Sequence, residues 1–260
     1  MKIAIIGYGK MGKMIEKAAL DKGHKIAAIV DPVVSVSGTG TPIYKSITES
    51  KNLNNADAAI EFTTPATAIQ NIASLSGLKI PAIIGTTGWH DKLEEVKNIV
   101  SKADSSLLWA TNFSLGVNVF YRIAWQASKI MNLFPEYDIG GFEAHHNKKL
   151  DSPSGTAKTL VEGVLARIDR KKSVVWDTLD RAPLPEELHY PSLRTGSIPG
   201  THSLIFDSAA DTIELTHTAR SREGFASGAV IAAQWLAGTK RKGVFTIDDM
   251  LMEMLGILNA

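Results

Sequence analysis

The sequence contains no cysteine among its 260 residues. Disulfide bonds, thiolate metal sites and a cysteine nucleophile are therefore excluded, and the composition fits a reducing compartment. Long hydrophobic runs are also missing, since none approaches the roughly 20 apolar residues that span a bilayer. The opening run Met1–Ile6 lacks the long apolar region and cleavage site of a secretory signal and is better explained as a strand. We therefore expect a cytoplasmic protein without a membrane partner.

The sequence also has no excess of charge of one sign, because 28 Lys and Arg residues face 27 Asp and Glu residues. This balance argues against a dedicated nucleic-acid binder, so any anion site must be local. Apolar residues make up 44% of the chain and charged residues 21%, which is ordinary usage for a globular protein. At roughly 100–200 residues per domain, the length predicts one large domain or, as we expect, two smaller ones.

The first hundred residues alternate short apolar runs with amphipathic stretches, a pattern typical of parallel strands joined by helices. The expected strands are Lys2–Ile6, Lys25–Val30, Asp57–Phe62, Ala82–Ile84 and Ser106–Ala110. The expected helices are Met11–Lys22, Ala66–Leu75 and Asp91–Ala103. This order predicts an α/β fold with a mainly parallel sheet, the arrangement of Rossmann-type domains.

From about Phe113 the pattern changes to longer segments that suggest an antiparallel α+β domain. The expected elements are a helix at Val117–Met131, a strand at Tyr137–His145, a long loop at Asp180–Pro199, and a hairpin of Ser203–Ala209 with Thr212–Thr218. Two final helices, Phe225–Leu236 and Ile247–Leu258, are expected to return to the first sheet, the last one opened by a capping box of Thr246 and Asp249. We therefore predict two domains, residues 1–113 with 224–260 and residues 114–223. The motifs within them assign dinucleotide binding to the first and substrate binding to the second.

The run Gly7-Tyr8-Gly9-Lys10-Met11-Gly12 fits the pattern G-x-G-x-x-G and stands between an expected strand and an expected helix. Gly7 permits a tight turn, Gly9 lets the backbone approach a pyrophosphate, and Gly12 allows the helix to pack closely on the strand. Free N–H groups at the start of the helix would then bind the diphosphate. The run predicts a dinucleotide site, and the alternative is a simple glycine turn.

Asp31 ends the second expected strand, 19 residues after Gly12. This is close to the offset of roughly 20 residues at which an acidic side chain meets the hydroxyls of the adenosine ribose. A carboxylate there favours NADH, whereas Lys10 can pair with the extra phosphate of NADPH. We therefore expect NADH, NADPH or both as cofactor, with NADH at least as well bound. The alternative is that Asp31 only caps the loop before Pro32.

Two further loops follow expected strands, Gly85-Thr86-Thr87-Gly88 and Ala110-Thr111-Asn112-Phe113. Ligands of open α/β sheets bind beyond the carboxyl ends of the strands, so both loops are expected to line the nicotinamide side of the site. Position alone is equally consistent with ordinary turns.

The segment Glu143–Ala157 carries the densest set of reactive side chains. Ser154 is a natural N-cap for a helix that opens at Gly155 and Thr156, whose free N–H groups suit a carboxylate. This helix is expected to run to about Ile168. An exposed polar loop beside a capped helix is the alternative.

His145 and His146 close an expected strand and would point to opposite faces if the strand continued, so one of them is expected to face a ligand. Histidine exchanges a proton near neutral pH, and Lys149 can donate a proton or pair with a substrate carboxylate. Further along, Arg222 can hold a carboxylate bidentately, although a solvated charged turn explains it equally well. No metal site is expected, because adjacent histidines without cysteine do not supply the usual ligand spacing of zinc.

Taken together, these residues resemble the dihydrodipicolinate reductase family, also called 4-hydroxy-tetrahydrodipicolinate reductase, of the bacterial diaminopimelate and lysine pathway. The most specific element is Glu143–Ala157, which is similar to the family signature E-x-H-H-x-x-K-x-D-x-P-S-G-T-A. The nucleotide loop, the turn Gly85–Gly88, the stretch Asn112–Asn118 and the run Ile213–His217 follow in the family's order. The resemblance covers essentially the whole chain.

The resemblance implies a reductase that passes hydride from NAD(P)H to C4 of the ring derived from 4-hydroxy-tetrahydrodipicolinate, with loss of water, giving tetrahydrodipicolinate. It implies that His145 is the acid/base group and Lys149 the proton donor. The implied substrate contacts are His146, Lys149 and the backbone of Gly155 and Thr156, and the implied cofactor contacts are Gly7–Gly12, Asp31, Gly85–Thr87 and Ala110–Phe113. The family also implies a homotetramer, with residues 114–223 serving oligomerisation as well as substrate binding.

Pro32 departs from those family members that carry an arginine after the acidic residue, where it pairs with the NADPH phosphate. Cofactor preference is therefore left open by the sequence. Two other functions use the same nucleotide unit, namely another two-domain NAD(P)-dependent amino-acid dehydrogenase and a non-catalytic NADH-sensing protein. The missing cysteine removes phosphorylating semialdehyde dehydrogenases, and the balanced charge offers no DNA-reading segment for a regulator.

Overall fold

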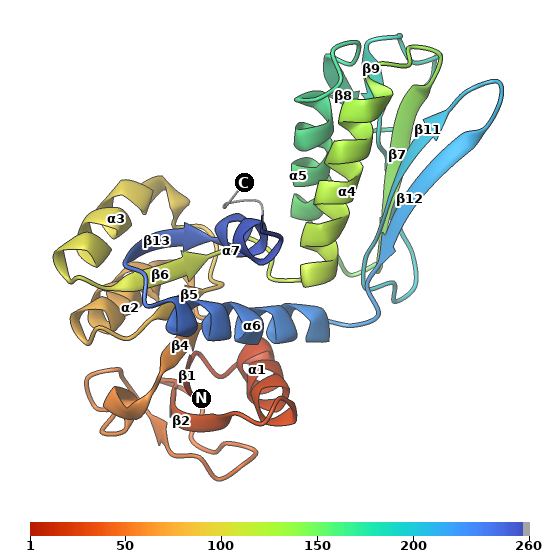
Figure 1. Ribbon diagram of the computed structural model, residues 1–260. Helices are drawn as coiled ribbons and strands as arrows, with labels where there is room; N and C mark the ends of the chain where they lie inside the picture. The colour runs from red at the N-terminus through yellow and green to blue at the C-terminus, as the bar shows by residue number, and fades with distance from the viewer. Residues whose placement is uncertain (257–260) are drawn as a thin grey trace. The chain divides into compact units, whose positions relative to one another are not determined.

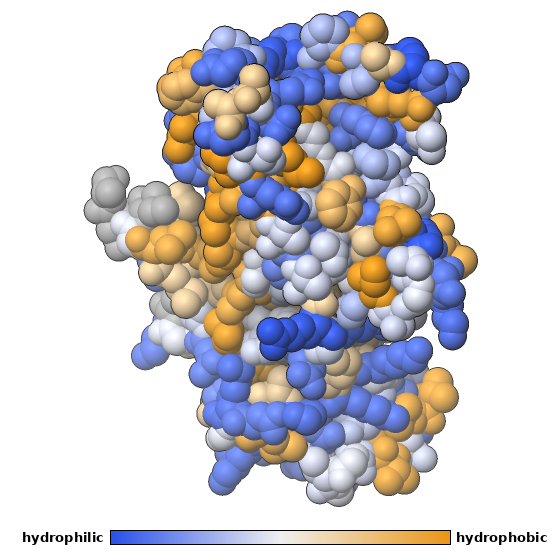
Figure 2. Space-filling view, turned by 90° about the vertical axis from the view of Figure 1, so that its right-hand side faces the viewer, coloured by the Kyte–Doolittle hydropathy of each residue, from blue (hydrophilic) through white to orange (hydrophobic). Residues whose placement is uncertain are grey.

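The computed structural model describes residues 1–256, and the chain divides into two compact units (Figure 1). The first unit contains Met1–Ser114 and the segment from Glu223 onward, and the second contains Leu115–Arg222. The assignment of cofactor binding to the first unit and substrate binding to the second stays a prediction. No helix within the described residues is long and apolar enough to cross a membrane. Figure 2 shows apolar side chains reaching the surface in several places between polar ones, as is usual for folded proteins.

The first unit is built on a seven-stranded sheet with the order β13-β6-β5-β4-β1-β2-β3, and all of its strand pairs are parallel. The strands are β1 Lys2–Ile6, β2 Lys25–Val30, β3 Ile43–Tyr44, β4 Ala58–Glu61, β5 Ala82–Ile84, β6 Ser106–Trp109 and β13 Gly243–Thr246. The α/β fold class is therefore confirmed. All five strands expected in this region are present, whereas β3 and β13 are additions that the sequence analysis did not predict.

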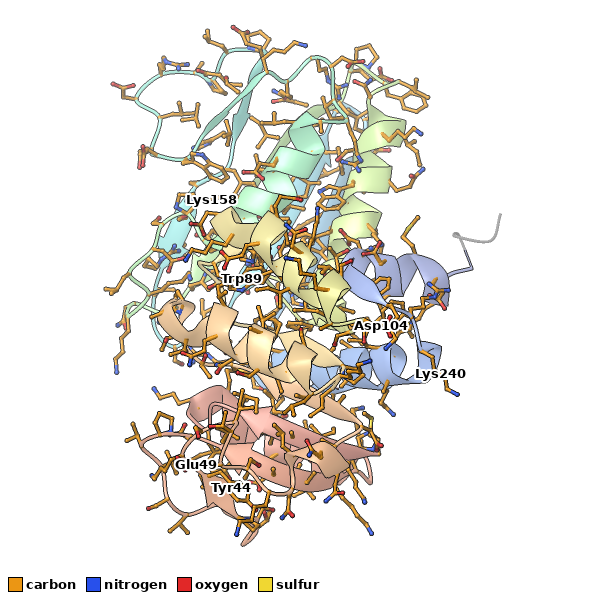
Figure 3. All side chains as sticks on the ribbon, turned by 90° about the vertical axis from the view of Figure 1, so that its left-hand side faces the viewer. Tyr44, Glu49, Trp89, Asp104, Lys158 and Lys240 are labelled. Carbon is orange, nitrogen blue, oxygen red and sulfur yellow. The ribbon has the colours of Figure 1, made fainter. Side chains whose placement is uncertain are left out.

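The helices of the first unit are α1 Lys10–Asp21, α2 Pro65–Gly77, α3 Leu93–Lys102, α6 Glu223–Thr239 and α7 Ile247–Met254, with short 3-10 turns η1 Leu53–Asn55 and η2 His90–Lys92. Trp89, labelled in Figure 3, precedes η2 and packs edge-on against Trp109, with ring centroids 5.9 Å apart. The capping box of Thr246 and Asp249 is confirmed. The predicted helix Ile247–Leu258 stops at Met254, and residues 257 and 258 lie outside the described residues.

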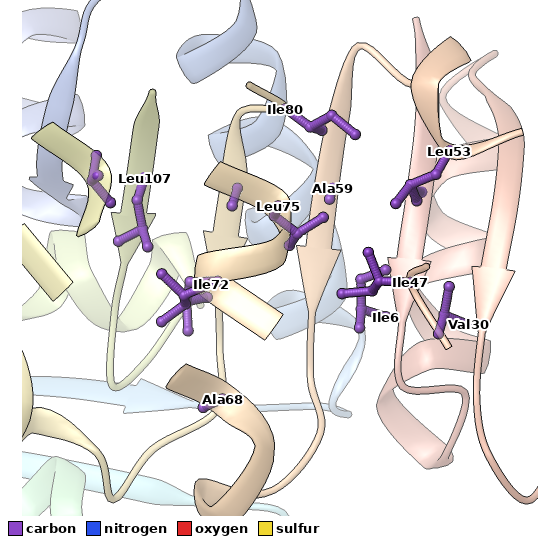
Figure 4. Close-up of a cluster of buried hydrophobic side chains, with 14 of the residues drawn as sticks. Ile6, Val30, Ile47, Leu53, Ala59, Ala68, Ile72, Leu75, Ile80 and Leu107 are labelled. Atoms are coloured by element: carbon purple, nitrogen blue, oxygen red, sulfur yellow. The ribbon is translucent and has the colours of Figure 1, made fainter. Parts of the chain in front are cut away.

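Both faces of this sheet are buried, which explains why its strands read as continuous apolar runs. On one face, Ile6 of β1 and Ala59 of β4 belong to a core that includes Ile72 and Leu75 of α2 (Figure 4). On the other face, Ile5 is also fully buried. Because strand alternation sends Ile5 and Ile6 to opposite faces, the helices must cover the sheet on both sides.

The second unit contains a six-stranded sheet. Five of its strands follow the order β12-β11-β7-β9-β8, and the sixth, β10, pairs with β7. Its strands are β7 Asp138–His145, β8 Ser173–Val175, β9 Glu187–His189, β10 Ser192–Arg194, β11 Thr201–Asp207 and β12 Thr212–Thr218. The helices α4 Leu115–Met131 and α5 Gly155–Leu165 supply Phe120 and Leu160 to a core that also contains Ile139 of β7. These helices therefore cover one face of the sheet.

The predicted loop Asp180–Pro199 is wrong, because it contains β9 and β10. Each of these strands has only three residues, too few for an alternating pattern to be visible in the sequence. Both are parallel neighbours of β7, so they form through distant pairing rather than local preference. The predicted hairpin is confirmed, with β11 starting two residues earlier than expected, at Thr201.

Candidate active site

The turn between β1 and α1 contains three glycines, which differ in how much space surrounds them. Gly7 has φ +92°, and a Cβ there would lie 2.2 Å from the carbonyl oxygen of Phe62. A Cβ at Gly12 would lie 2.2 Å from the carbonyl oxygen of Gly7. Gly9, the N-cap of α1, is exposed, and nothing lies within 4 Å of the place a Cβ would take. The first turn of α1 is therefore open to a ligand at Gly9.

Asp31 directly follows β2, and its carboxylate links the turn between β1 and α1 to the loop that follows β2. Its Oδ2 accepts a hydrogen bond from the N–H of Tyr8 at 2.7 Å, and its Oδ1 accepts two from Val33 and Val34 at 2.8 Å each. Burial alone would raise the pKa of Asp31, but these three N–H groups and the charge of Lys45 hold the pKa below its usual value. Asp31 is therefore a fixed negative charge at neutral pH.

A cavity of about 620 Å³ opens at the carboxyl ends of β1, β2 and β4, a volume in the range of small-molecule sites. Its walls include Gly7, Gly9, Asp31, Lys45, Phe62 and Thr63. Cavities at this edge of an open parallel sheet are where such folds bind their ligands. The glycine turn and Asp31 are therefore brought together around one space.

Phe62 connects this cavity with the two other loops that the sequence singled out. A Cβ at Gly85 would overlap the Phe62 ring, at 2.1 Å from its tip, and the Phe113 ring lies 6.0 Å from it. Next to Gly85, the Thr86 hydroxyl accepts a hydrogen bond from the N–H of Thr63 at 2.8 Å. The turn Gly85–Gly88 and Phe113 therefore adjoin a wall of the cavity, while Thr111 is exposed.

The sequence analysis missed Phe62, Thr63 and Lys45 as wall residues of the cavity. Phe62 and Thr63 directly follow β4, so the rule that selected the other two loops also applies to them. Lys45 follows β3, and a strand of two residues leaves no signal of this kind.

In the second unit, His145 is the last residue of β7 and is 8% exposed. The strand ends there, and His146 begins the following turn, half-buried. Glu143 and His145 share a face with Ile139, which belongs to the core beneath α4 and α5. The Nδ1 of His145 lies 3.2 Å from Oε2 of Glu143. His145 therefore sits at the polar end of the helix-covered face.

Helix α5 begins beside this pair. The hydroxyl of Ser154 accepts a hydrogen bond from the N–H of Ala157 at 3.1 Å, so Ser154 is its N-cap. Gly155 is exposed, and a Cβ there would meet nothing within 4 Å. The positive end of the helix dipole is thus accessible to an anion. The helix ends at Leu165, three residues before the predicted end.

Lys149 lies in the loop between β7 and α5, where its Nζ is 2.8 Å from Oδ1 of Asp151. Its side chain is 20% exposed, so the ammonium group is partly withdrawn from water. The ring of His202 of β11 lies 5.2 Å from that of His145, and the charge of Lys149 also acts on His202. Arg222 is exposed just before α6, and no hydrogen bond or ion pair within the described residues joins it to this group.

Comparison with known proteins gives one family over nearly the whole chain. Residues 1–113 match the family model described as dihydrodipicolinate reductase, N-terminus, and residues 116–251 match the model described as its C-terminus. A 4-hydroxy-tetrahydrodipicolinate reductase of Christiangramia forsetii is 38% identical over 256 residues, which covers 98% of this chain and 99% of that protein. One from Archaeoglobus fulgidus is 34% identical over 268 residues, covering 96% and 100%.

Solved structures agree in fold. A dipicolinate-bound dihydrodipicolinate reductase from Paenisporosarcina sp. TG-14 has a TM-score of 0.76 at 20% identity, covering 95% of this chain and 97% of that one. The C. glutamicum DAP dehydrogenase in complex with DAP has a TM-score of 0.56 at 15% identity, covering 95% and 92%. At these identities the structural likeness establishes the two-unit dehydrogenase fold alone.

Proposed function

The chain belongs to the dihydrodipicolinate reductase family, and we propose that its two units divide the reaction between them, the first holding the cofactor and the second the substrate. The protein is an NAD(P)H-dependent oxidoreductase, which reduces 4-hydroxy-tetrahydrodipicolinate to tetrahydrodipicolinate in diaminopimelate and lysine biosynthesis. Overall, the ring takes up one hydride and one proton and loses its hydroxyl group as water. The division of labour rests on one observation: a cavity at the glycine turn in one unit, and a histidine, a lysine and a capped helix start in the other.

The first unit fits a nicotinamide dinucleotide. The open backbone at Gly9 suits the pyrophosphate, and the charged carboxylate of Asp31 suits the ribose hydroxyls. When bound, the cofactor supplies the hydride. We assign the pyrophosphate to the loop Gly7–Gly12, the adenosine ribose to Asp31, and the nicotinamide side to Gly85–Thr87 and Ala110–Phe113.

The same surroundings predict that both cofactors are used. The negative charge of Asp31 repels the additional phosphate of NADPH, which favours NADH. Lys10 and Lys45 are exposed cations near the same turn and attract that phosphate. Lys45 already donates hydrogen bonds to the carbonyl groups of Pro32 and Val34, so it is held next to Asp31.

In the second unit, the substrate is a small dicarboxylate. One carboxylate is assigned to the backbone N–H groups of Gly155 and Thr156 at the start of α5, with His146 and Lys149 beside it. Arg222 is assigned to the substrate as well, from the end of the same unit. Lys149 donates the proton, and His145 serves as the acid/base group.

A direct assay tests this function. The purified protein is mixed with substrate generated from aspartate semialdehyde and pyruvate, and the loss of nicotinamide absorbance is followed with NADH and with NADPH. We expect turnover with both cofactors. Absence of substrate-dependent oxidation with either cofactor would refute the reductase assignment.

Lys149→Ala separates chemistry from cofactor binding. Because Lys149 lies in the second unit, we expect turnover to fall about 100-fold or more, as for the loss of a general acid, with the dissociation constant of NADH unchanged. Lys148→Ala is the matched control, since Lys148 is the exposed neighbour, and it should behave like the wild type. Steady-state rates that are equal in the Lys149→Ala variant and the wild type would remove Lys149 from the mechanism.

Assembly and location belong to the same proposal. We propose a cytoplasmic homotetramer, as the family resemblance implies. In support, α4 exposes Val119, Ile123 and Ile130 along one side, each about half accessible, and the chain has no cysteine. Sedimentation analysis should give a mass of four chains of 28.0 kDa each, and a single-chain mass at assay concentration would contradict it.

A further inference from the structure

A buried carboxylate, Glu143, lies beside His145 and has no role in the mechanism proposed above. Glu143 of β7 has no exposed surface. Removing a charge from water so completely is costly unless the charge is paired and hydrogen-bonded. Glu143 meets that condition with partners from three segments of the second unit: its own strand, the N-cap of α5, and β10.

One oxygen of this carboxylate fixes the start of α5. Oε1 accepts hydrogen bonds from the N–H of Ser154 at 3.0 Å, the hydroxyl of Ser192 at 2.7 Å and Nη2 of Arg194 at 2.7 Å. The same Nη2 of Arg194 also donates to the carbonyl group of Asp151 at 2.9 Å. The N-cap of α5 is therefore bonded directly to this buried oxygen, and the loop that carries Lys149 is linked to it through Arg194.

The other oxygen faces His145. Oε2 lies 3.2 Å from Nδ1, within ion-pair distance, and neither atom has a hydrogen-bond partner within the described residues. A carboxylate at Nδ1 holds the ring proton on that nitrogen and leaves Nε2 as the reactive one. Gly200, with φ +154°, packs on the Nε2 side, where a Cβ would come within 3.0 Å of that nitrogen. The glycine therefore leaves Nε2 the room that a side chain would take.

The groups around Glu143 and His145 favour a negative charge on Glu143 and do not oppose a positive charge on His145. Burial alone would raise the pKa of Glu143, but its interactions with His145, Ser154, Arg194 and Ser192 hold the pKa far below its usual value. The ring of His202 stands edge-on to His145 with centroids 5.2 Å apart, and burial lowers the pKa of His202 to about 4. His202 is therefore neutral at pH 7 and does not oppose a positive charge on His145. The other titratable groups that interact with this pair are His217 of β12, opposite His202 in the sheet, together with Lys149, Asp151 and Tyr190.

We propose that Glu143 is a positioning residue for His145: its carboxylate aims Nε2 at the substrate, stabilises the protonated ring, and ties that ring to the helix start that receives a carboxylate. His145 exchanges a proton with the substrate through Nε2 without net transfer, since Lys149 supplies the proton taken up overall, and Glu143 keeps its negative charge throughout. The inference rests on the proposed function, because it requires His145 to be the acid/base group.

Glu143→Gln tests the charge and keeps the shape. The amide retains an oxygen for Ser154, Ser192 and Arg194 but turns a donor toward Nδ1. We expect kcat to fall about 10- to 100-fold, as for other partners of functional histidines. The KM for the substrate and the affinity for NADH should stay within about twofold, because the start of α5 remains held. The pH above which kcat declines should move down by about one unit or more, since the protonated ring loses its counter-charge.

Glu162→Gln is the matched control, because Glu162 is an exposed glutamate on α5. It should leave kcat and the pH profile unchanged. His145→Ala is run in parallel to separate the two hypotheses. If the wild type is active and His145→Ala is not, but Glu143→Gln keeps the wild-type kcat and pH profile, the positioning role is refuted and the reductase function stands. If the wild type itself shows no turnover, the proposed function fails first.

A second measurement does not depend on activity or on how well Glu143→Gln folds. Nitrogen NMR of the wild type, with the His145 signals assigned by comparison with His145→Ala, reports which ring nitrogen carries the proton in the neutral form. The geometry predicts a proton on Nδ1. A neutral His145 protonated on Nε2 would overturn the inference.

Discussion

At the scale of the residue, we expect cofactor selection to depend on Asp31. Replacing it with alanine removes the acceptor proposed for the ribose hydroxyls of NADH and the charge that repels the extra phosphate of NADPH. It also releases the N–H groups of Tyr8, Val33 and Val34, which weakens binding of both cofactors. We expect the dissociation constant of NADH to rise about tenfold or more, and that of NADPH to rise less.

Fluorescence titration of both cofactors checks this prediction. Asp21→Ala is the control, because Asp21 is exposed at the end of α1 and pairs with Lys17. The informative quantity is the ratio of the two dissociation constants. A ratio that is the same in Asp31→Ala and the wild type would show that Asp31 does not discriminate between the cofactors.

Glu143 also makes a prediction about stability. The pKa of Glu143 in the folded protein lies below its ordinary value of 4.5, so the ionised group favours the folded state. This stabilisation is complete above the unfolded value and is lost as the pH falls from about 4.5 toward the folded value. Thermal unfolding from pH 7 to pH 3 should therefore bring the wild type and Glu143→Gln closer together at low pH. A gap that widens on acidification would contradict the charged, hydrogen-bonded state.

At the scale of the residue, sequence reasoning identified groups that stand close together along the chain. Gly7, Gly9 and Gly12 are neighbours along the chain, so a motif captures them. Glu143 falls inside the segment that resembles the family signature, yet its partners Ser154 and Arg194 lie 11 and 51 residues away. Only the folded sheet brings such groups together, and no spacing rule reveals them.

At the scale of the element, two variants of the turn between β1 and α1 separate its stability from its cofactor binding. Gly7→Ala forces a side chain into a left-handed conformation against Phe62, and we expect it to cost about 1–3 kcal/mol of stability or to prevent folding. Gly9→Ala enters open space at φ −74°, so the unfolding temperature should stay close to that of the wild type. Its methyl group should nevertheless weaken binding of NADH and NADPH, because it occupies the path of the pyrophosphate.

Thermal unfolding and cofactor titration of both variants separate stability from binding. The decisive case is Gly9→Ala, which should be stable and poor at binding. Wild-type affinity for both cofactors in this variant would remove the glycine turn from the proposed cofactor site.

Elements were predictable in proportion to their length and regularity. The expected strand at Lys2–Ile6 coincides with β1 because a buried parallel strand reads as an unbroken apolar run. The strands β3, β9 and β10 have two or three residues each and are held by their neighbours, so they leave no periodic signal. The expected helix Asp91–Ala103 is a 3-10 turn followed by α3, a difference that helical periodicity does not resolve.

At the scale of the whole molecule, the chain leaves the first unit at Ser114 and returns to it at Glu223. A change of pattern in the sequence is enough to suggest two folded units, and the glycine motif is enough to suggest a dinucleotide in the first. The identity of the substrate came from the resemblance carried by Glu143–Ala157, since histidine, lysine and a helix start suit many carboxylates. The strand order of the second sheet could not be predicted, because β7 pairs with β11 and β10, which come much later in the chain.

The central claim is that this chain moves a hydride from a nicotinamide to C4 of the substrate ring, and isotope transfer tests it most directly. The enzyme is supplied with the substrate and with NADH carrying deuterium at C4 of the nicotinamide, prepared separately in each of the two stereochemical forms. Mass spectrometry of the product should find one deuterium at ring C4 from one form and none from the other. A product that forms without deuterium from either labelled form would contradict direct transfer and the account built on it.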